Sequence, residues 1–186
     1  VAYFAAIQRD ITADKERADE LAHLAFHDAL TRLPNRRMLL ARLGCALQAS
    51  RRSGSHLAVL FIDLNRFKQL NDTHGHQAGD QMLVEVANRL GQRVRGGDTV
   101  ARLGGDEFVV LLGELGTDRP TAQRAAVQVA DELQQELARA YTLGELTCQG
   151  SASVGVYVVR GADAGSVEQV LSAADSAMYG DKQRQR

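Results

Sequence analysis

The chain has 186 residues, which is enough for one full domain and an attached segment. Its formal net charge is −1, so it lacks the basic balance of proteins that bind duplex nucleic acid, and we expect no nucleic-acid partner. Apolar residues make up 45% of the chain but form no run near the roughly 18 residues of a membrane span. We therefore expect a globular, cytoplasmic domain with a core of Leu, Val and Ala.

The N-terminal segment differs from the rest of the chain. Residues 1–9 are mostly apolar and begin like the middle of a strand, which indicates a fragment of a longer protein; an anchor elsewhere in that protein is compatible with this. A polar helix should follow, with Thr12 as its N-cap. Its apolar residues recur in a 3-then-4 step that fits a short coiled-coil seam or a solvated linker helix equally well: Ala18, Leu21 and Ala25.

The next part of the chain has one helix signal and one strand signal. Pro34 disfavours a helical conformation at the residue before it, so the chain should turn there. Residues 57–62 form a continuous apolar run, as expected for a strand buried on both faces, and this run ends at Asp63. The helix expected between the turn and the strand has three apolar residues on one face: Leu39, Leu43 and Leu47.

After a polar loop, helix and strand signals continue to the C-terminus. Residues 78–95 predict a helix, residues 99–112 predict a β-hairpin, and Pro120 is a good first-turn residue for a second long helix. Residues 147–159 predict a strand, and Ser166 begins a capping box that opens a final helix. This order predicts an α/β (α+β) sandwich in which helices pack on a mainly antiparallel sheet.

The cysteines and histidines carry no metal-binding pattern. Cys45 and Cys148 match no metal spacing, and we interpret both as free, reduced, buried thiols of a reducing compartment. His74 and His76 flank Gly75, but no third ligand is evident nearby. Helix capping or loop packing is therefore the favoured interpretation of this pair.

The predicted hairpin over residues 99–112 has an acidic tip. Gly104 and Gly105 are followed at once by Asp106 and Glu107. Glycine permits the positive φ values of a tight turn and lets a ligand approach bare backbone. Because two adjacent acids repel each other unless a cation or a donor lies between them, this tip is a candidate site for a metal ion and a phosphate.

Asp63 is a second candidate for the same site. An acid at the end of a buried strand is often a helix cap or simply solvates the strand end. The alternative is that the hairpin brings Asp106 beside it. Two carboxylates and triphosphate oxygens would then form an oxygen-only octahedral site that suits Mg²⁺, which neutralises phosphate charge and can activate an attacking hydroxyl.

The polar stretch over residues 63–80 carries groups suited to a nucleotide. Backbone N–H groups near residues 65–67 could hold phosphates at a helix start, with Lys68 as a point charge. Asn71 offers both a donor and an acceptor, and Asp80 can accept from N1–H and N2–H₂ of guanine. The pair is therefore a candidate reader of that base.

Four blocks, in this order, resemble the signatures of the GGDEF family, the diguanylate cyclases. They are residues 28–36 (Asp-x-Leu-Thr-x-Leu-Pro-Asn-Arg), residues 63–80, residues 102–108 with the Gly-Gly-Asp-Glu-Phe run, and residues 174–179 with the cations that follow. The resemblance covers residues 28–186 and implies the nucleotidyl-cyclase, palm-like fold of that family. Residues 6–20 resemble the last strand and exit linker of a PAS sensor, so residues 1–27 are interpreted as the end of an upstream PAS-like domain and its linker helix.

This resemblance implies roles for individual residues. The catalytic acids would be Asp63, Asp106 and Glu107. The ligands of Mg²⁺, or of Mn²⁺ in its place, would be Asp63, Asp106 and the backbone carbonyl of Leu64. The substrate-binding positions would be Phe67, Lys68, Asn71, Asp80, Gly104, Gly105, Lys182 and Arg186.

The implied reaction joins two GTP molecules into cyclic di-GMP and releases pyrophosphate. It would take place in a homodimer in which each 3′-hydroxyl attacks the α-phosphate of the other GTP, a reaction that depends on positioning and charge neutralisation. The alternatives are a silent GTP-binding module that regulates an attached phosphodiesterase domain, a pure cyclic di-GMP receptor, and an adenylyl-cyclase-like or polymerase-palm enzyme. The intact acids favour the cyclase.

Arg95 and Asp98 form a second candidate site. They match the inhibitory Arg-x-x-Asp motif of the family, where cyclic di-GMP binds back as product. Arginine can donate two hydrogen bonds to O6 and N7 of guanine, and aspartate can accept from N1–H. The alternative interpretation is a charge pair at a helix C-terminus with a glycine stop.

The chain departs from the family pattern at three positions. Asn65 stands where a second aspartate is frequent, Asp181 where a small residue is usual, and Gln185 where a glycine often precedes the last arginine. The first change removes a charge beside the site without removing an implied ligand. The other two weaken the case for phosphate contacts at the C-terminus.

Overall fold

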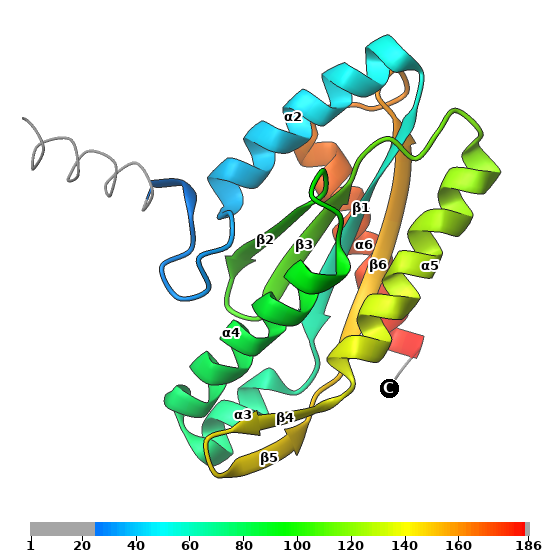
Figure 1. Cartoon of the computed structure of the whole chain (residues 1–186). Coiled ribbons are helices and arrows are strands. Elements are labelled where there is room, and N and C mark those ends of the chain that lie inside the picture. The colour runs from blue at the N-terminus through cyan, green and yellow to red at the C-terminus, as the bar shows by residue number, and fades with distance from the viewer. Residues whose placement is uncertain (1–24, 185–186) are drawn as a thin grey trace, which may run out of the picture.

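The computed structural model describes residues 25–184, apart from the side chains of residues 181, 183 and 184. The strand and helix expected over residues 1–24, and both Gln185 and Arg186, lie outside the described residues. The described chain forms a four-stranded antiparallel sheet in the order β2-β3-β1-β6, with helices on both faces (Figure 1). The predicted fold class is therefore confirmed.

The elements follow one another along the chain with short connections. In order they are α2 (Arg36–Ser53), β1 (His56–Leu64), α3 (Phe67–His74), α4 (His76–Arg93), β2 (Thr99–Gly104), β3 (Glu107–Leu112), α5 (Arg119–Leu137), β4 (Ala140–Leu143), β5 (Leu146–Gln149), β6 (Ala152–Arg160) and α6 (Val167–Arg184). Strands β4 and β5 form a separate two-stranded hairpin.

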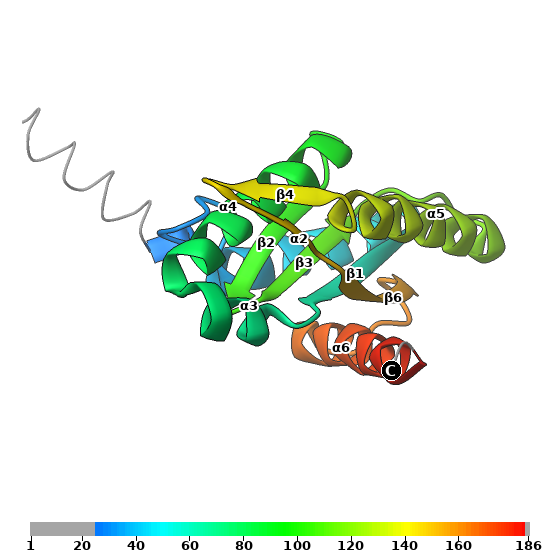
Figure 2. The same cartoon turned by 90° about the horizontal axis from the view of Figure 1, so that it is seen from below.

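Strand β1 lies between two hydrophobic layers. All nine of its residues are buried, because β3 and β6 flank it and helices cover both faces. Leu57, Val59 and Phe61 pack with α2 and α6, whereas Leu60 and Ile62 pack with α4 and α5. Figure 2 shows α6 across the sheet from α5 and β4. The alternation follows from the two-residue period of a strand and confirms that β1 is buried on both faces.

Capping groups close both ends of α2 and the start of α6. The side chain of Asn35 accepts from the Met38 N–H at 3.2 Å, and Gly54 ends α2 with φ 72°. At the start of α6, the Gln169 N–H donates to Ser166 Oγ at 3.2 Å and the Ser166 N–H donates to Gln169 Oε1 at 2.8 Å. This reciprocal pair confirms the predicted capping box.

Two elements differ from the prediction. The expected polar loop after β1 contains a complete helix, α3, which begins where the sequence indicated a helix start near residues 65–67. None of its eight residues is fully buried, and its half-buried Phe67 and Leu70 pack against the core. The strand predicted over residues 147–159 is divided between β5 and β6. The break lies at Gly150, where a Cβ would stand 2.6 Å from the Tyr141 ring, so the chain passes close to the core there.

The predicted burial of the cysteines is wrong for Cys45. Its thiol is free, but the residue is exposed because it lies on the solvent side of α2, opposite the buried Leu43 and Leu47. Cys148 is also free and is half-buried on β5. Burial raises the pKa of the Cys148 thiol.

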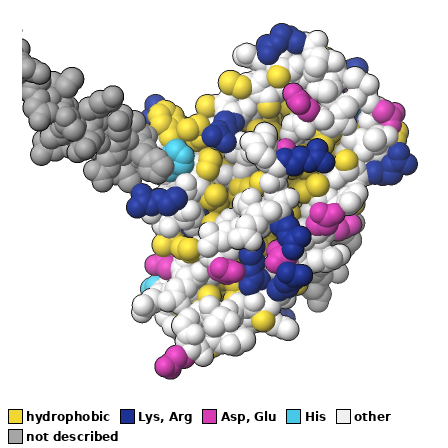
Figure 3. All heavy atoms as spheres, viewed as in Figure 1, with side chains coloured by type: hydrophobic (Ala, Val, Ile, Leu, Met, Phe, Trp, Pro, Cys, Tyr) yellow, Lys and Arg dark blue, Asp and Glu magenta, His cyan; other side chains and the backbone are white. Residues whose placement is uncertain are grey.

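The surface is mixed in charge. Lys and Arg side chains are interspersed with Asp and Glu on the face that Figure 3 displays. Within residues 25–184, no helix combines the length and the apolar character needed to cross a bilayer.

Candidate active site

Three acids meet at one end of the sheet. Asp63 is next to last in β1, and the antiparallel register pairs it with Glu107 at the start of β3. Asp106 precedes Glu107 in the turn, and its carbonyl accepts from the Leu64 N–H at 3.3 Å. Strand pairing therefore brings together the three predicted catalytic acids, which come from two separate segments of the chain.

The glycines of the acidic turn adopt backbone conformations that side chains disfavour. Gly104 has φ 146° and Gly105 has φ 52°. A Cβ at either position would meet nothing within 4 Å, so the requirement for glycine at this turn comes from backbone conformation rather than from space.

Arg102 holds this turn in place from its first strand. Its Nε and Nη2 donate to the Gly105 carbonyl at 3.1 and 2.8 Å. Its Nη1 donates to Asp28 Oδ1 at 2.9 Å, and its backbone N–H donates to the Pro34 carbonyl at 3.0 Å. Sequence reasoning assigned no role to Arg102 or Asp28, although both lie in blocks that resemble the family.

Lys182 reaches the acids from α6. Its Nζ donates to Asp63 Oδ1 at 2.5 Å, and their side chains are 29% and 13% exposed. Burial raises the pKa of Asp106, and the charge of Asp63 adds to this, whereas Lys182 and Arg102 oppose it. Burial also raises the pKa of Glu107, with contributions from Asp106 and Asp175. The acids thus form a site where a cation is electrostatically favoured.

The protein side chains alone do not form a closed metal site. Among the described residues, no three His, Cys, Asp or Glu side chains lie close enough together to hold a metal ion. Asp63 and Asp106 supply oxygen donors, and Leu64, whose hydrocarbon side chain has no ligating atom and is buried in the core, could take part only through its backbone carbonyl. This hard, incomplete donor set fits a Mg²⁺ ion that takes its other ligands from phosphate and water.

A cavity of about 590 Å³ lies beside the acids. It is lined by α3, by residues 148–151 before β6, and by Lys182 of α6. Of the predicted substrate-binding residues it includes Phe67 and Lys182. Lys68 is exposed on α3, outside the cavity lining.

The two predicted guanine readers lie on neighbouring helices. Asn71 is on α3, and Asp80 is on α4, exposed, in a smaller hollow of about 360 Å³ that Leu30 also lines. Asn71 Oδ1 is buried and has no hydrogen-bond partner within the described part of the chain. A buried polar atom without a partner calls for an explanation, and a functional role of the side chain is one.

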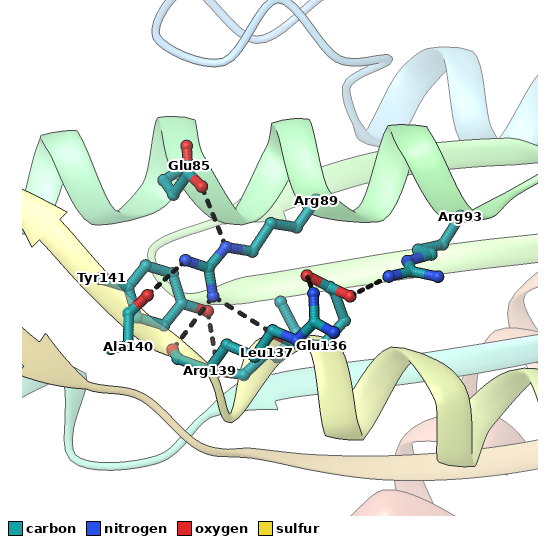
Figure 4. A network of polar contacts seen from close by, with 8 residues as sticks. All are labelled: Glu85, Arg89, Arg93, Glu136, Leu137, Arg139, Ala140 and Tyr141. Atoms are coloured by element: carbon teal, nitrogen blue, oxygen red, sulfur yellow. Dashed lines mark hydrogen bonds and ion pairs between the residues drawn. The ribbon is translucent and has the colours of Figure 1, made fainter.

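The β4–β5 hairpin also lines the hollow that contains Asp80. A network of hydrogen bonds and ion pairs centred on an arginine attaches this hairpin to α4 (Figure 4). The guanidinium of Arg89 lies 3.8 Å from the centre of the Tyr141 ring. It donates to the carbonyls of Glu136, Arg139 and Ala140 at 2.7–3.1 Å, and its Nε pairs with Glu85. One side chain of α4 thereby binds the end of α5 and the start of β4.

The second predicted site lies at the other end of β2. Asp98 Oδ2 accepts from the Arg95 N–H at 3.1 Å, and its Oδ1 accepts from the Gly113 N–H at 3.3 Å. Both Arg95 and Asp98 line a cavity of about 630 Å³, together with Arg52 of α2 and His56. Strand β2, about 20 Å long, separates this cavity from the acidic turn.

An antiparallel sheet between two helical layers, with an acidic turn beside the end of its central strand, defines this protein as a GGDEF-type domain. The GGDEF domain of PA1120 (TpbB or YfiN) from Pseudomonas aeruginosa has the same fold, with a TM-score of 0.78, 40% identity, and coverage of 85% of this chain and 89% of that one. The coiled coil and GGDEF domain of DgcB from Caulobacter crescentus, solved in complex with c-di-GMP, gives a TM-score of 0.82 at 26% identity, covering 95% and 90%.

The family described as "Diguanylate cyclase, GGDEF domain" matches residues 25–186, and the chain belongs to this family. Curated relatives include the bifunctional diguanylate cyclase/cyclic di-GMP phosphodiesterase MucR of Pseudomonas aeruginosa, 42% identical over 90% of this chain and 23% of MucR. The diguanylate cyclase TpbB of the same species is 41% identical over 89% of this chain and 37% of TpbB. The chain thus spans less than two-fifths of the length of these two relatives. The predicted family membership is confirmed.

Proposed function

We propose that this domain is a Mg²⁺-dependent diguanylate cyclase that condenses two GTP molecules into cyclic di-GMP and pyrophosphate. The observation that carries the proposal is the meeting of Asp63, Asp106 and Glu107 beside a cavity that Lys182 also lines. Family membership and relatives named diguanylate cyclases support the same activity. We expect the domain to act in the cytoplasm, where GTP is available. In the full-length protein we expect a PAS-like sensor upstream, and a phosphodiesterase domain is the candidate downstream partner.

Each group of residues has a separate task in this proposal. Asp63, Asp106 and the Leu64 carbonyl would hold the metal ion, or Mn²⁺ in its place, which when bound neutralises phosphate charge and favours ionisation of the attacking hydroxyl. Lys182 would contribute a positive charge beside the phosphates, with Lys68 and Arg186 as further phosphate-binding candidates. Phe67 and the bare backbone of Gly104 and Gly105 would complete the substrate contacts.

Guanine recognition is assigned to Asn71 and Asp80. The amide of Asn71 and the carboxylate of Asp80 match the donor and acceptor pattern of the guanine edge. The unpartnered Oδ1 of Asn71 supports this assignment, because an unsatisfied buried acceptor costs stability, which indicates that the asparagine is present for a role other than stability.

Catalysis requires two copies of the domain. One domain presents one cavity beside one set of acids, whereas the product contains two guanosine units. We therefore propose a homodimer in which each domain holds one GTP and each 3′-hydroxyl attacks the α-phosphate on the partner. Product inhibition is assigned to the second cavity, where Arg95 and Asp98 would bind cyclic di-GMP.

A second candidate function is a catalytically silent GTP-binding module that regulates a phosphodiesterase. The observation that favours it is the similarity to MucR, whose name describes both activities, and of which this chain spans only 23%.

The test is to incubate the purified domain with GTP and Mg²⁺ at high protein concentration and to identify the products by mass spectrometry. Formation of cyclic di-GMP that stops when Mg²⁺ is withheld is the expected result. GTP binding without product, also in a domain fused to a dimerising coiled coil, would overturn the cyclase proposal in favour of the silent module.

A further inference from the structure

Gly79 lies where α3 and α4 come into close contact. The two helices are joined at Gly75, and Gly79 is buried one turn into α4. Its neighbour in space is Asn71 of α3, and its neighbour in sequence is Asp80. Gly79 therefore contacts Asn71 and directly precedes Asp80, the two residues assigned to guanine recognition.

The space at Gly79 is taken by the Asn71 side chain. A Cβ at this position would stand 1.9 Å from Asn71 Oδ1, 2.9 Å from Asn71 Cγ and 3.2 Å from Phe67 Cζ. Non-bonded carbon atoms settle at about 3.5–4.0 Å, so a methyl group and the present position of the Asn71 carboxamide exclude each other.

The backbone offers no reason for glycine at this position. Gly79 is not among the glycines of positive φ in the described chain, and it lies inside a helix, where glycine is less stable than alanine. The contact with Asn71 is therefore the structural feature that requires the missing side chain.

We propose that Gly79 is a positioning residue for guanine specificity. It leaves room for the Asn71 carboxamide to lie against α4, next to Asp80, in the arrangement that reads the base. This inference rests on the proposed function, because it requires that Asn71 contacts guanine. Two observations on the same contact support it, namely the exclusion of a Cβ at Gly79 by Asn71 and the buried, unpartnered state of Asn71 Oδ1.

The test compares Gly79→Ala with Gly91→Ala. Gly91 lies on the same helix, is exposed, and a Cβ there would meet nothing within 4 Å, so it controls for the added methyl and for helix propensity. Binding of the α,β-methylene analogues of GTP and ATP, which cannot release pyrophosphate, is measured by calorimetry. We expect Gly79→Ala to lower the ratio of GTP-analogue to ATP-analogue affinity by about tenfold, the order of one lost hydrogen bond, and Gly91→Ala to leave it unchanged.

A double variant tests whether the effect passes through Asn71. In the Asn71→Ala background the two nearest clashing atoms, Oδ1 and Cγ of Asn71, are gone, and the 3.2 Å approach to Phe67 Cζ remains. Adding Gly79→Ala should therefore cause no further loss of guanine preference. The double variant should also melt no lower than Asn71→Ala alone. The inference would be overturned if Gly79→Ala lowered guanine preference by the same factor in the Asn71→Ala background as in the wild type. It would also be overturned if Gly79→Ala lowered the melting temperature equally in both backgrounds. Either result would show that Gly79 does not act through Asn71.

The outcomes separate this inference from the proposed function. A wild-type domain that binds the two analogues equally would refute guanine reading, and with it both proposals. A wild-type domain that prefers the GTP analogue, with a Gly79→Ala variant that retains this preference, would refute the role of Gly79 alone.

Discussion

Asp28 and Arg102 form an ion pair, with Nη1 and Oδ1 2.9 Å apart, that ties the loop before α2 to the acidic turn. The two residues are 74 positions apart in the chain. Burial alone would raise the pKa of Asp28, but hydrogen bonds from Thr31 and Arg102 outweigh it, and the pKa falls below its ordinary value. Asp28 thus stays charged and anchors Arg102, which in turn donates to the Gly105 carbonyl.

This relationship predicts that Arg102→Ala impairs the reaction without unfolding the domain. Loss of both contacts would free the turn that carries Asp106, and a displacement of about 1 Å at a reacting centre can cost about 100-fold in rate. Initial rates of cyclic di-GMP formation are the measurement. The control is Arg160→Ala, which removes an exposed pair with Asp163 and should leave the rate unchanged.

Asp106→Ala should abolish Mg²⁺-dependent turnover while the domain remains folded. We expect a loss of at least about 100-fold, the order found when one electrostatic group of a transition-state site is removed. Because burial and Asp63 raise the pKa of Asp106, its removal also relieves repulsion, and the thermal midpoint without metal should not fall. Full activity in this variant would contradict the metal role.

Arg95→Ala should relieve product inhibition and leave the initial rate unchanged. A bidentate contact to guanine contributes about 1–3 kcal/mol, so the inhibition constant should rise by at least about tenfold. Rates at increasing added cyclic di-GMP measure this effect. Arg93→Ala is the matched control, because Arg93 is the last residue of α4, two positions before Arg95, and pairs with Glu136 instead. Unchanged inhibition in Arg95→Ala would remove the site assignment.

Tyr141→Phe should reveal an alkaline dependence of stability. The phenol is buried and donates to the Leu137 carbonyl at 2.9 Å, so the variant should lose about 1 kcal/mol at neutral pH. Burial raises the pKa of Tyr141 to about 12. Because the folded state holds this proton more tightly than the unfolded state, the stability from it is complete below about pH 10 and is lost as pH rises towards 12.

Chemical denaturation at several pH values measures the difference between wild type and Tyr141→Phe. The advantage of the wild type should shrink between pH 10 and 12. The corresponding control is Tyr179→Phe, at a position that is 60% exposed. A constant difference across this range would contradict the assignment of a raised pKa to Tyr141.

Much of the fold could be predicted because the strongest signals are local. The apolar run before Asp63 predicted the buried central strand, and the stripe at Leu39, Leu43 and Leu47 predicted α2. For helix α3 the sequence indicated only a start near residues 65–67, because none of its residues is fully buried and its contacts with the core come from the half-buried Phe67 and Leu70. The break at Gly150 escaped because the close approach of the chain to Tyr141 at this position is a tertiary contact, which no local pattern reveals.

The sequence by itself determined the family, the chemical types at the site and which acids belong to it. Their spacing and the glycines of the turn were sufficient for this, because turn conformation and side-chain chemistry are local properties. Only the tertiary structure decided that Lys182 reaches Asp63 across 119 positions, that Arg102 depends on Asp28, and that Asn71 occupies the space left by Gly79. These contacts depend on strand register and helix packing, which are set by the whole core rather than by any one segment.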